Sequence, residues 1–423
     1  MAYEQQLNVT IALKSPLLIT RQQVGFVWES ETFIPGSVIR GAVAEIAKQA
    51  GEDLGAFFSG GSTPLFGNAY AGTKATCGIL PLTARTCKRH GGFKRSEQDD
   101  ERHGVYDTLL TAWLQSDASE SRCTCGEPTE PYAGEAYTFV GKAPHYAAPH
   151  VLLQRIGRTG VARERGAAAD GLLYTLEVIS DQMALDELDR SGLPMQAATV
   201  FHAKVWAGRS EASQLVKWLP QVKHLGGARS RGLGEVVITC AINEVPLPDD
   251  RVIQKAAWQL TEGELKKDSG HPAEMGTLER ILTFNAPIAS HEQGKDFWYF
   301  SVDLESDAIL GTNCAPLFSL AAADLGFPLK VELVQSWAHH GEAGGWSTVW
   351  GLPKPVSPAL VTGSTFLFRV PRGGGEDLAF KTLKRCLILE REGIGQRREE
   401  GFGWLKICRS EEHTSELQSP NTI

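Results

Sequence analysis

Hydrophobic and polar residues follow two different periods along this chain, and together the two periods predict a protein of mixed α and β structure. Residues 7–13 alternate apolar and polar side chains, which is typical of a strand with one buried face. Residues 37–50 carry apolar side chains at helical spacing, with Ser37 placed to cap the helix and Gly51 just beyond its end. Further strands are predicted at 172–178, 235–242, 298–306, 364–370 and 404–408, and further helices from Ser210 to Pro220 and at 376–390.

The chain contains an internal repeat, because each half ends with a helix, a loop rich in glycine and arginine, and a strand. The loops read GGARSRGLGEV from residue 226 and GIGQRREEGFGWL from residue 393, and both combine glycine and arginine with a Gly-x-Gly that leads into a strand. Two copies in one structural context are stronger evidence than a single glycine-rich turn. A helix followed by a final strand is typical of the end of a βαββαβ unit.

Composition narrows the class of protein. The 423 residues carry a formal net charge of −8, include eight cysteines and contain no apolar run long enough to cross a membrane. No secretory signal is visible and the cysteines are too sparse for a disulfide scaffold, so we expect a cytoplasmic protein with reduced thiols. The acidic balance argues weakly against a nucleic-acid partner, but basic residues gather in local groups.

The two glycine loops could each bind an anion. Glycine lets backbone N–H groups approach a phosphate closely, and arginine can add bidentate contacts. The arginines concerned are Arg229, Arg231, Arg397 and Arg398. The alternative is a structural turn whose arginines are merely solvated.

The segment IPGSVIRG at 34–41 offers a second candidate anion site. Ser37 lies at the expected helix N-terminus and Arg40 in the first turn, where a cation opposes the helix dipole unless an anion binds there. The alternative is a capped helix whose arginine pairs with a carboxylate.

Three of these segments, IPGSVIRGAVAEIA, GGARSRGLGEV and GIGQRREEGFG, resemble the signature elements of the RAMP superfamily of CRISPR proteins. Four more are similar to the type III-D RAMP subunit, the Csx-ten family, which belongs to the five-group of CRISPR subunits. These are LPLTARTCKRH (80–90), HGVYDTLL (103–110), CTCGEPTEPYAG (123–134) and RTGVARERGAAADGLLYTLEVI (158–179). The resemblance covers residues 5–408, patchily across 245–295.

The resemblance implies two ferredoxin-like, RRM-like RAMP domains, and hence an α+β fold. From the pattern of elements we expect these domains at 1–245 and 296–408, with an insertion near 60–150 in the first that binds zinc and a linker or peripheral segment at 246–295. It implies a structural subunit, not an enzyme, that caps the 5′ handle of the crRNA in antiviral defence. Its partners would be the crRNA, the backbone RAMP subunits and the large polymerase-like subunit, with target RNA contacted indirectly. Residues implied to face RNA are Ser37, Arg40, Arg229, Ser230, Arg231, Gly232 and Gly234, with Arg158, Arg163 and Arg165 on a basic hairpin or loop nearby.

A candidate metal cluster lies in the insertion and comprises Cys87, His103, Cys123 and Cys125. Three thiolates and an imidazole suit a tetrahedral structural zinc ion, which would stabilise a segment with little apolar sequence. The Cys-x-Cys spacing departs from the usual paired Cys-x-x-Cys, and Cys77 or His90 could replace one ligand. The alternative is a loop with free cysteines.

Two other functions compete with guide-RNA binding. One is a RAMP-type endoribonuclease that processes crRNA by acid–base chemistry, for which His224, beside the first glycine loop, is the best candidate. No paired-carboxylate or metal-nuclease motif is visible. The other is a zinc-stabilised scaffold that contacts only protein partners.

The last segment of the sequence needs separate treatment. RSEEHTSELQS (409–419) resembles a translated sequencing adapter, so we expect residues 409–423 to belong to no fold.

Overall fold

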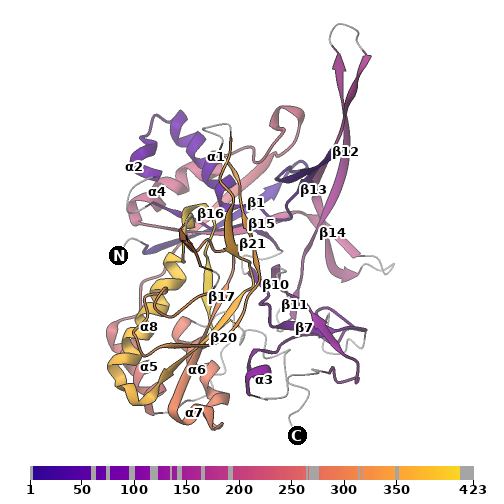
Figure 1. The fold of residues 1–423 in the computed structure, drawn as a ribbon. Coiled ribbons are helices and arrows are strands. Elements are labelled where there is room, and N and C mark those ends of the chain that lie inside the picture. Colours follow the sequence, from indigo (N-terminus) through magenta and orange to yellow (C-terminus); the bar gives the residue numbers. More distant parts are fainter. Residues whose placement is uncertain are drawn as a thin grey trace.

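A computed structural model describes residues 3–409 apart from 59–62, 73–76, 95–100, 115–121, 134–135, 141–144, 163–166, 189–193, 263–264, 266–275, 313–314, 318 and 348–351. Two antiparallel sheets, each packed against helices, lie one beyond the other, and a long two-stranded ribbon projects from the molecule (Figure 1). The class is α+β, as the sequence predicts. Within the described ranges, no helix is both long and apolar enough to cross a membrane.

The first sheet is formed by the N-terminal half of the chain. Its strands are β1 (Gln5–Leu13), β4 (Leu65–Phe66), β5 (Tyr70–Ala71), β15 (Val200–Ala207) and β16 (Val236–Glu244). Their order is β16–β1–β15–β4, with β5 also paired to β15, and all pairs are antiparallel. Every second side chain of β1 is buried, which confirms the alternation seen in the sequence. Helices α1 (Gly36–Gln49), α2 (Leu54–Phe58) and α4 (Arg209–Trp218) share the core with these strands.

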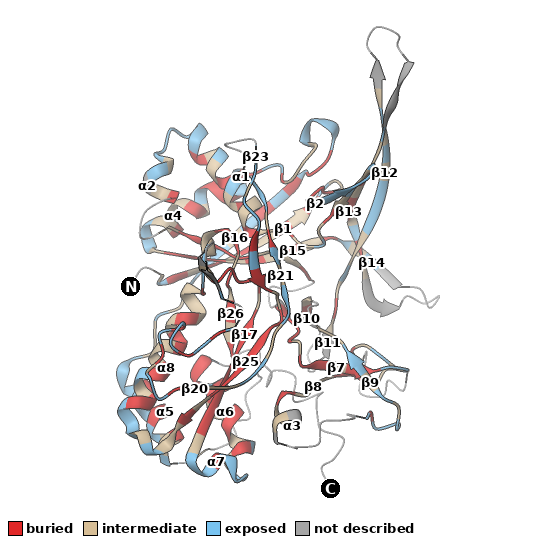
Figure 2. Ribbon diagram, viewed as in Figure 1, coloured by how far each residue is buried: buried red, intermediate tan, exposed pale blue. Residues whose placement is uncertain are grey.

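The second sheet is formed by the C-terminal half. Its strands are β17 (Phe297–Leu304), β20 (Glu332–Trp337), β25 (Thr365–Pro371) and β26 (Leu405–Ile407), in the order β20–β25–β17–β26. Helices α5 (Asp250–Glu262), α6 (Thr277–Ile288), α7 (Gln293–Asp296) and α8 (Gly375–Glu392) lie beside it (Figure 1). Almost every position of β17 is buried, including the polar residues Ser301 and Asp303, so this interior strand is covered on both faces (Figure 2).

Residues 246–295 are part of the core rather than the linker or peripheral segment expected from the sequence. α5 and α6 bury Ile253, Leu260, Ile281 and Phe284 against the second sheet. Arg280 is 4% exposed, forms an ion pair with Glu390 of α8 and donates to the carbonyl of Ile407. The charged sequence concealed these helices, because their apolar residues are spaced on one face between charges.

The expected insertion begins later than predicted, since β4 and β5 complete the first sheet. It then contributes three strands around β10 and three around β7. These are β6 (Cys77–Ile79), β7 (Ala84–Cys87), β8 (Val105–Asp107), β9 (Thr129–Pro131), β10 (Ala136–Val140) and β11 (His145–Ala147). Helix α3 (Leu109–Leu114) lies between β8 and β9. The insertion packs against the second sheet: Leu82 N donates to Gly363 O at 2.7 Å, and the rings of Trp113 and Tyr299 lie 4.4 Å apart.

The projecting ribbon consists of β12 (His150–Ala162) and β13 (Ala167–Leu188), far longer than the strand predicted at 172–178. Near its base, β13 pairs with β3 (Val27–Ser30), which forms a hairpin with β2 (Thr20–Val24), and also with β14 (Pro194–Ala198). Much of β12 is exposed (Figure 2).

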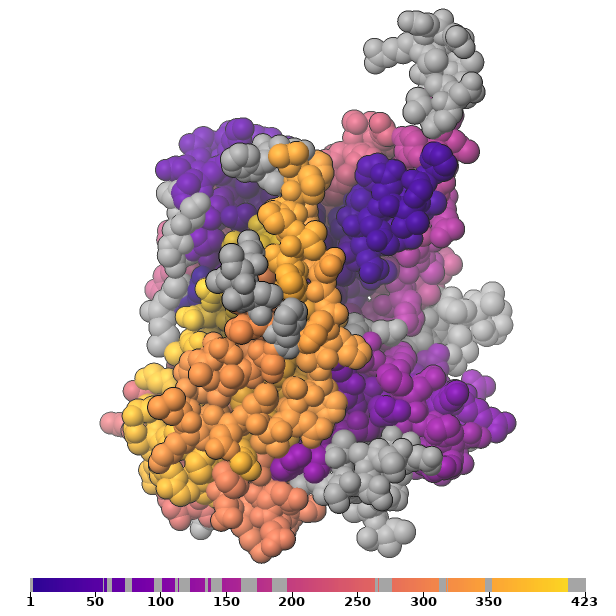
Figure 3. Space-filling view, in the orientation of Figure 1, coloured from indigo at the N-terminus to yellow at the C-terminus, as the bar shows by residue number. Residues whose placement is uncertain are grey.

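Short hairpins complete the second half. They comprise β18 (Gly311–Thr312) with β19 (Ala315–Pro316), β21 (His340–Ala343) with β24 (Ser357–Leu360), and β22 (Trp346–Ser347) with β23 (Leu352–Pro353). The space-filling view shows this orange segment rising alongside the N-terminal half, with a furrow between it and the indigo hairpin of β2 and β3 (Figure 3).

Arg409 corrects one expectation about the end of the chain. Although the adapter-like segment was expected to start here, Arg409 is 2% exposed and its Nη1 lies 2.5 Å from Glu305 Oε1. Its backbone N–H donates to Asp303, and its guanidinium donates to Tyr137 Oη of the insertion. The packed structure therefore includes Arg409, and residues 410–423 lie outside the described part of the chain.

Candidate functional site

The two glycine loops have the same backbone. Ala228 and Arg397 occupy matching left-handed conformations, with φ of 56° and 55° and ψ of 30° for both. Each is followed by one turn of 3-10 helix and then by a left-handed glycine, Gly232 (φ 81°) or Gly401 (φ 102°). The turns are η2 (Arg229–Arg231) and η5 (Arg398–Glu400).

Matching hydrogen bonds fix this alignment. Leu225 N donates to Gly234 O, and Ile394 N donates to Gly403 O, both at 2.8 Å. The loops 226–234 and 395–403 are therefore equal in length, and the second quoted segment is longer only because it starts two residues before its loop, at Gly393. Gly234 and Gly403 are required by packing, because an added Cβ would lie 2.0 Å and 1.8 Å from the carbonyl oxygens of Leu225 and Ile394.

The first loop presents its arginines to solvent. Arg229, Ser230, Arg231 and Gly232 are all exposed. Arg229 Nη1 lies 2.8 Å from Glu45 Oε2 of α1, in a pair whose side chains are 41% and 53% exposed. Solvent screens such a pair strongly, so the guanidinium stays available to a stronger anion.

The ribbon contributes further basic residues beside this loop. Arg231 Nη1 donates to Tyr174 Oη of β13 at 2.5 Å. Arg158 of β12 is directly opposite Tyr174 in the strand register, and its Nε is buried without a hydrogen-bond partner among the described residues. Two of the sequence-predicted arginines thus adjoin one tyrosine, Arg231 through a hydrogen bond and Arg158 through strand pairing. Arg163 and Arg165 lie outside the described residues.

The second loop is buried against the first half of the molecule. Glu400 is 8% exposed, pairs with Arg397 at 2.7 Å and also forms an ion pair with Lys354. Burial opposes ionisation of Glu400, but Lys354 and Arg397 hold its pKa below the usual value. Arg398 donates to the carbonyl of Glu392 at 2.9 Å. Both arginines of this predicted anion-binding loop therefore make internal contacts.

The N-terminus of α1 is occupied by the protein itself. The N-cap is Pro35 rather than Ser37, which lies inside the first turn and makes no capping hydrogen bond. Gly36 N donates to Asn68 Oδ1 at 2.9 Å, and an added Cβ on Gly36 would lie 2.0 Å from Phe66 O and 3.1 Å from Glu400 O. The second loop and β4 thus close this helix end, which contradicts the interpretation of it as an anion site.

Arg40 likewise packs internally. Its Nη2 donates to the carbonyl of Phe58 at 3.1 Å, and its guanidinium lies 5.2 Å from the centroid of the Phe58 ring. This contact fixes α2 against α1, and it differs both from phosphate binding and from the carboxylate pair considered as the alternative.

Aromatic residues beside the first loop were missed in the sequence. Phe26 and Trp28, in the β2–β3 hairpin, are 68% and 37% exposed, and Phe26 O accepts from Thr175 N of β13. Two large aromatics around the Gly25 turn were a visible signal, but only the strand pairing places them near Tyr174 and Arg231.

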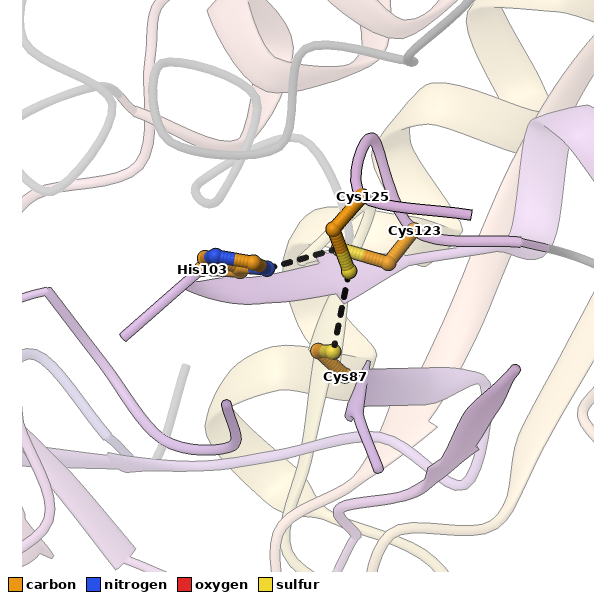
Figure 4. Close-up of side chains that lie close together, drawn as sticks. All are labelled: Cys87, His103, Cys123 and Cys125. Carbon is orange, nitrogen blue, oxygen red and sulfur yellow. Dashed lines mark hydrogen bonds between the residues drawn. The ribbon is translucent and has the colours of Figure 1, made fainter. Parts of the chain in front are cut away.

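The four predicted metal ligands come together in the insertion (Figure 4). Their ligand atoms all lie within 4.8 Å of one another, with Cys87 Sγ 3.7 Å from Cys125 Sγ and His103 Nδ1 3.1 Å from Cys123 Sγ. Cys87 ends β7, and His103 precedes β8. A turn closed by hydrogen bonds between Cys123 and residues 126 and 127 carries the other two cysteines.

The electrostatics of this cluster favour a bound cation. Burial opposes ionisation of Cys123, but hydrogen bonds from the Tyr106 hydroxyl, the Cys125 backbone, Thr124 and His103 lower its pKa to about 6. Burial raises the pKa of Cys87, and the nearby Cys125 and Cys123 sulfurs raise it further. Cys123 is therefore a thiolate at neutral pH, and a bound cation would stabilise its charge and allow the neighbouring thiols to ionise as well.

The donor set can hold a metal ion. Tetrahedral zinc–sulfur bonds of about 2.3 Å would separate two sulfurs by about 3.8 Å, close to the spacing of Cys87 and Cys125. His90 stacks on His103 with centroids 4.5 Å apart, and its Nδ1 contacts Glu101 O, so it supports a ligand instead of replacing one. The side chain of Cys77 lies outside the described residues.

His224, the candidate nuclease residue, is exposed and lies opposite Glu235 in an isolated β-bridge before the first loop. In its exposure and its surroundings, His224 resembles an ordinary surface histidine.

No protein-family model and no curated protein matches the chain. Chains of cryo-EM structures of the type III-B Cmr-beta complex are loosely similar. One, bound to cognate target RNA, has a TM-score of 0.29 at 11% identity and covers 57% of this chain and 98% of that chain. Another, bound to target RNA and AMPPnP, has a TM-score of 0.33 at 9% identity with 86% of each chain covered. A chain of the apo state has a TM-score of 0.30 at 12% identity and covers 57% and 99%. Scores this low establish neither family nor function.

Proposed function

We propose that this chain is a non-catalytic RAMP-type subunit of a type III-D CRISPR effector complex, and that it holds the 5′ handle of a guide RNA. The observation that carries the proposal is the exposed loop at 226–234. This loop has the backbone of its buried counterpart but presents Arg229 and Arg231 to solvent beside Arg158 of the ribbon.

Two ferredoxin-like units are the proposed domain plan. The first runs β1–α1–β4–β15–α4–β16 with the sheet order β16–β1–β15–β4. The second has the equivalent strand order, β26–β17–β25–β20, and its last helix, α8, likewise leads through a glycine loop into the edge strand. The order fourth–first–third–second is that of a βαββαβ unit. The second unit departs from this pattern. In a βαββαβ unit the first helix follows the first strand, whereas α5 and α6 precede β17.

Phosphate binding by the first loop has a direct physical basis. A left-handed residue beside a right-handed turn directs successive N–H groups into one concavity, which is an anion-binding arrangement. Ala228 with Arg229 has such a pair of conformations. The N–H groups of Arg231 and Gly232 instead donate within the loop, to the carbonyls of Ala228 and Arg229. The adjacent guanidiniums supply charge in the geometry that phosphate prefers.

Holding the RNA is favoured over cutting it. A general acid or base needs a partner that positions it, and the exposed bridge of His224 supplies no such side chain among the described residues. Backbone RAMP subunits and a large polymerase-like subunit are the proposed protein partners, and the cytoplasm the proposed location.

The test is the double variant Arg229→Ala, Arg231→Ala in binding to guide RNA. We expect a loss of about 1–3 kcal/mol per charged hydrogen bond and a decrease of roughly 0.7 per contact in the slope of log affinity against log salt. The control is Lys255→Ala, Lys381→Ala, which removes two exposed charges from α5 and α8. Equal affinities and slopes for both double variants would refute RNA binding at this loop, and RNA cleavage lost in His224→Ala would favour the nuclease instead.

Zinc is the metal proposed for the cysteine cluster, with the structural role of joining β7, β8 and the 122–128 turn. Elemental analysis should find about one zinc per chain. Cys123→Ser with Cys125→Ser should lose that metal and expose the insertion to protease while the first sheet stays folded. Metal-free protein with an equally protected insertion would contradict this role.

A further inference from the structure

The hairpin of β2 and β3 places aromatic side chains on the face that the first glycine loop covers. In the strand register Trp28 is paired with Leu176 of β13, and Leu176 with Ile156 of β12. Paired residues and residues two apart share a face, so Trp28, Leu176, Tyr174 and Arg158 lie on one side of this sheet.

The same face is basic at one end and apolar at the other. Leu176 is buried with Leu233 of the first loop, and Ala228 packs beside them. The hydroxyl oxygen of Tyr174 accepts a hydrogen bond from Arg231. Trp28 remains 37% exposed next to this cluster, and Phe26 at the hairpin turn is 68% exposed. Glu29 alternates to the opposite side of β3, where it accepts from Gln22.

An exposed tryptophan beside guanidiniums has a specific use. Single-stranded nucleic acids bind where a basic groove follows the backbone and aromatic rings stack on the bases. A protein partner could also bury the ring. It would gain from the arginines only where it placed carboxylates opposite them, whereas every nucleotide of an RNA brings a phosphate. The charge of the surroundings therefore favours RNA bases as the occupant.

We propose that Trp28 and Tyr174 form a stacking surface for unpaired RNA bases, so that the ligand of this site is single-stranded RNA read through its base faces. This inference rests on the proposed function, because it assigns the bases to the ring side chains and the phosphates to Arg229 and Arg231. Base stacking is tolerant of sequence, because every base presents a flat aromatic face.

Trp28→Ala in the full chain is the first test, with a short fluorescent oligoadenylate as the probe and fluorescence anisotropy as the measurement. We expect affinity to fall about ten-fold with an unchanged salt slope, because no phosphate contact is lost. Trp28→Phe should recover most of the affinity. Trp258→Ala is the matched control, since Trp258 is 41% exposed on α5 of the other unit, and it should bind as the wild type does.

Two further measurements keep the inference testable if Trp28→Ala misfolds. RNA should quench the tryptophan fluorescence of the wild type more than that of Trp28→Phe, and an oligomer of abasic ribose phosphates should bind equally to both. Trp28→Ala with wild-type affinity would overturn the stacking surface alone when Arg229→Ala, Arg231→Ala still loses RNA. Wild-type protein that binds no single-stranded RNA would sink both proposals, and Trp28→Ala that impairs only subunit assembly would make this face a protein interface.

Discussion

The loops at 226–234 and 395–403 share one backbone, yet they lie in opposite surroundings. Both have a left-handed residue, a 3-10 turn and a left-handed glycine at matching positions. The first is exposed at its tip, whereas the second is packed on the N-terminus of α1 and against Asn68. Glycine therefore fixes the path of the chain in both loops, and other residues decide what each loop contacts.

The third residue of each turn shows the difference between the two loops most clearly. Arg231 and Glu400 are the third residues of the two turns. Arg231 reaches the hydroxyl of Tyr174, while Glu400 binds Lys354 and Arg397 within the protein. The same loop backbone thus faces outward in the first half of the molecule, whereas in the second half it joins the two halves.

The largest expected effect is on stability, from Gly401→Ala. An added Cβ would lie 2.3 Å from Asn68 Oδ1, which caps α1, and the left-handed φ disfavours any side chain. Overpacking, lost capping and backbone strain together should cost about 3–4 kcal/mol. Chemical denaturation gives the value.

Gly232→Ala is the matched control for that change. Nothing lies within 4 Å of its added Cβ, so only the backbone strain of about 1–2 kcal/mol remains. Equal losses in the two variants would mean that the second loop is not packed more tightly than the first.

The next effect concerns the ion pairs, from Glu400→Gln. Removing the charge leaves Lys354 and Arg397 without their shared carboxylate, and we expect a loss of about 2–3 kcal/mol at neutral pH. Because the folded pKa of Glu400 is lowered, its contribution is complete above the ordinary glutamate pKa of about 4.3 and is lost as the pH falls through the folded value.

Unfolding measured between neutral pH and acid should therefore converge for wild type and Glu400→Gln at low pH. Glu45→Gln removes the exposed partner of Arg229 and should cost less than about 0.5 kcal/mol. A constant gap between wild type and Glu400→Gln down to strong acid would show that the carboxylate charge is not what stabilises the loop.

A smaller effect, on binding, is expected when the first loop receives the residue of the second. Arg231→Glu removes a cation and adds an anion at an exposed site, so guide-RNA affinity should fall by about 2 kcal/mol while the melting temperature stays nearly unchanged. Filter binding and a thermal melt separate the two. Gly234 is unsuitable for such a test, since its substitution would clash with Leu225 O and unfold the loop.

Much of the fold could be predicted from the sequence, because local patterns determine it. The alternation in β1, the helix α8 and the repeated loops follow from period and glycine placement. The cysteine cluster also assembled as predicted, since its residues flank strands that pair with one another.

Other features depend on contacts between distant segments, which no local pattern contains. Asn68 caps α1 from another strand region, so Ser37 was mistaken for the cap. Arg40 finds the carbonyl of Phe58, and α5 and α6 cover a sheet that follows them in sequence. Trp28 and Tyr174 lie near each other only because β3 and β13 pair in parallel.

The smallest expected effect on stability comes from replacing the left-handed residue of each loop by glycine. The changes in the free energy of unfolding should have opposite signs for the two variants. Ala228→Gly relieves a strained φ of 56°, worth about 1–2 kcal/mol, and costs about 0.4–1 kcal/mol through the entropy of the unfolded chain. A net stabilisation of less than about 1 kcal/mol follows, because the Ala228 methyl loses only partly buried contacts beside Leu176 and Leu233. Arg397→Gly relieves the same strain but removes the pair with Glu400 and a guanidinium 4.6 Å from the Phe402 ring, and it leaves the buried carboxylate with Lys354. We expect this variant to be destabilised by about 1–2 kcal/mol. Urea midpoints of the two variants, measured at pH 7 with equal m-values, would decide the matter. Stabilisation by both would mean that Arg397 contributes nothing to the junction, and the contrast between the outward and the inward loop would then depend on Glu400 and Lys354 alone.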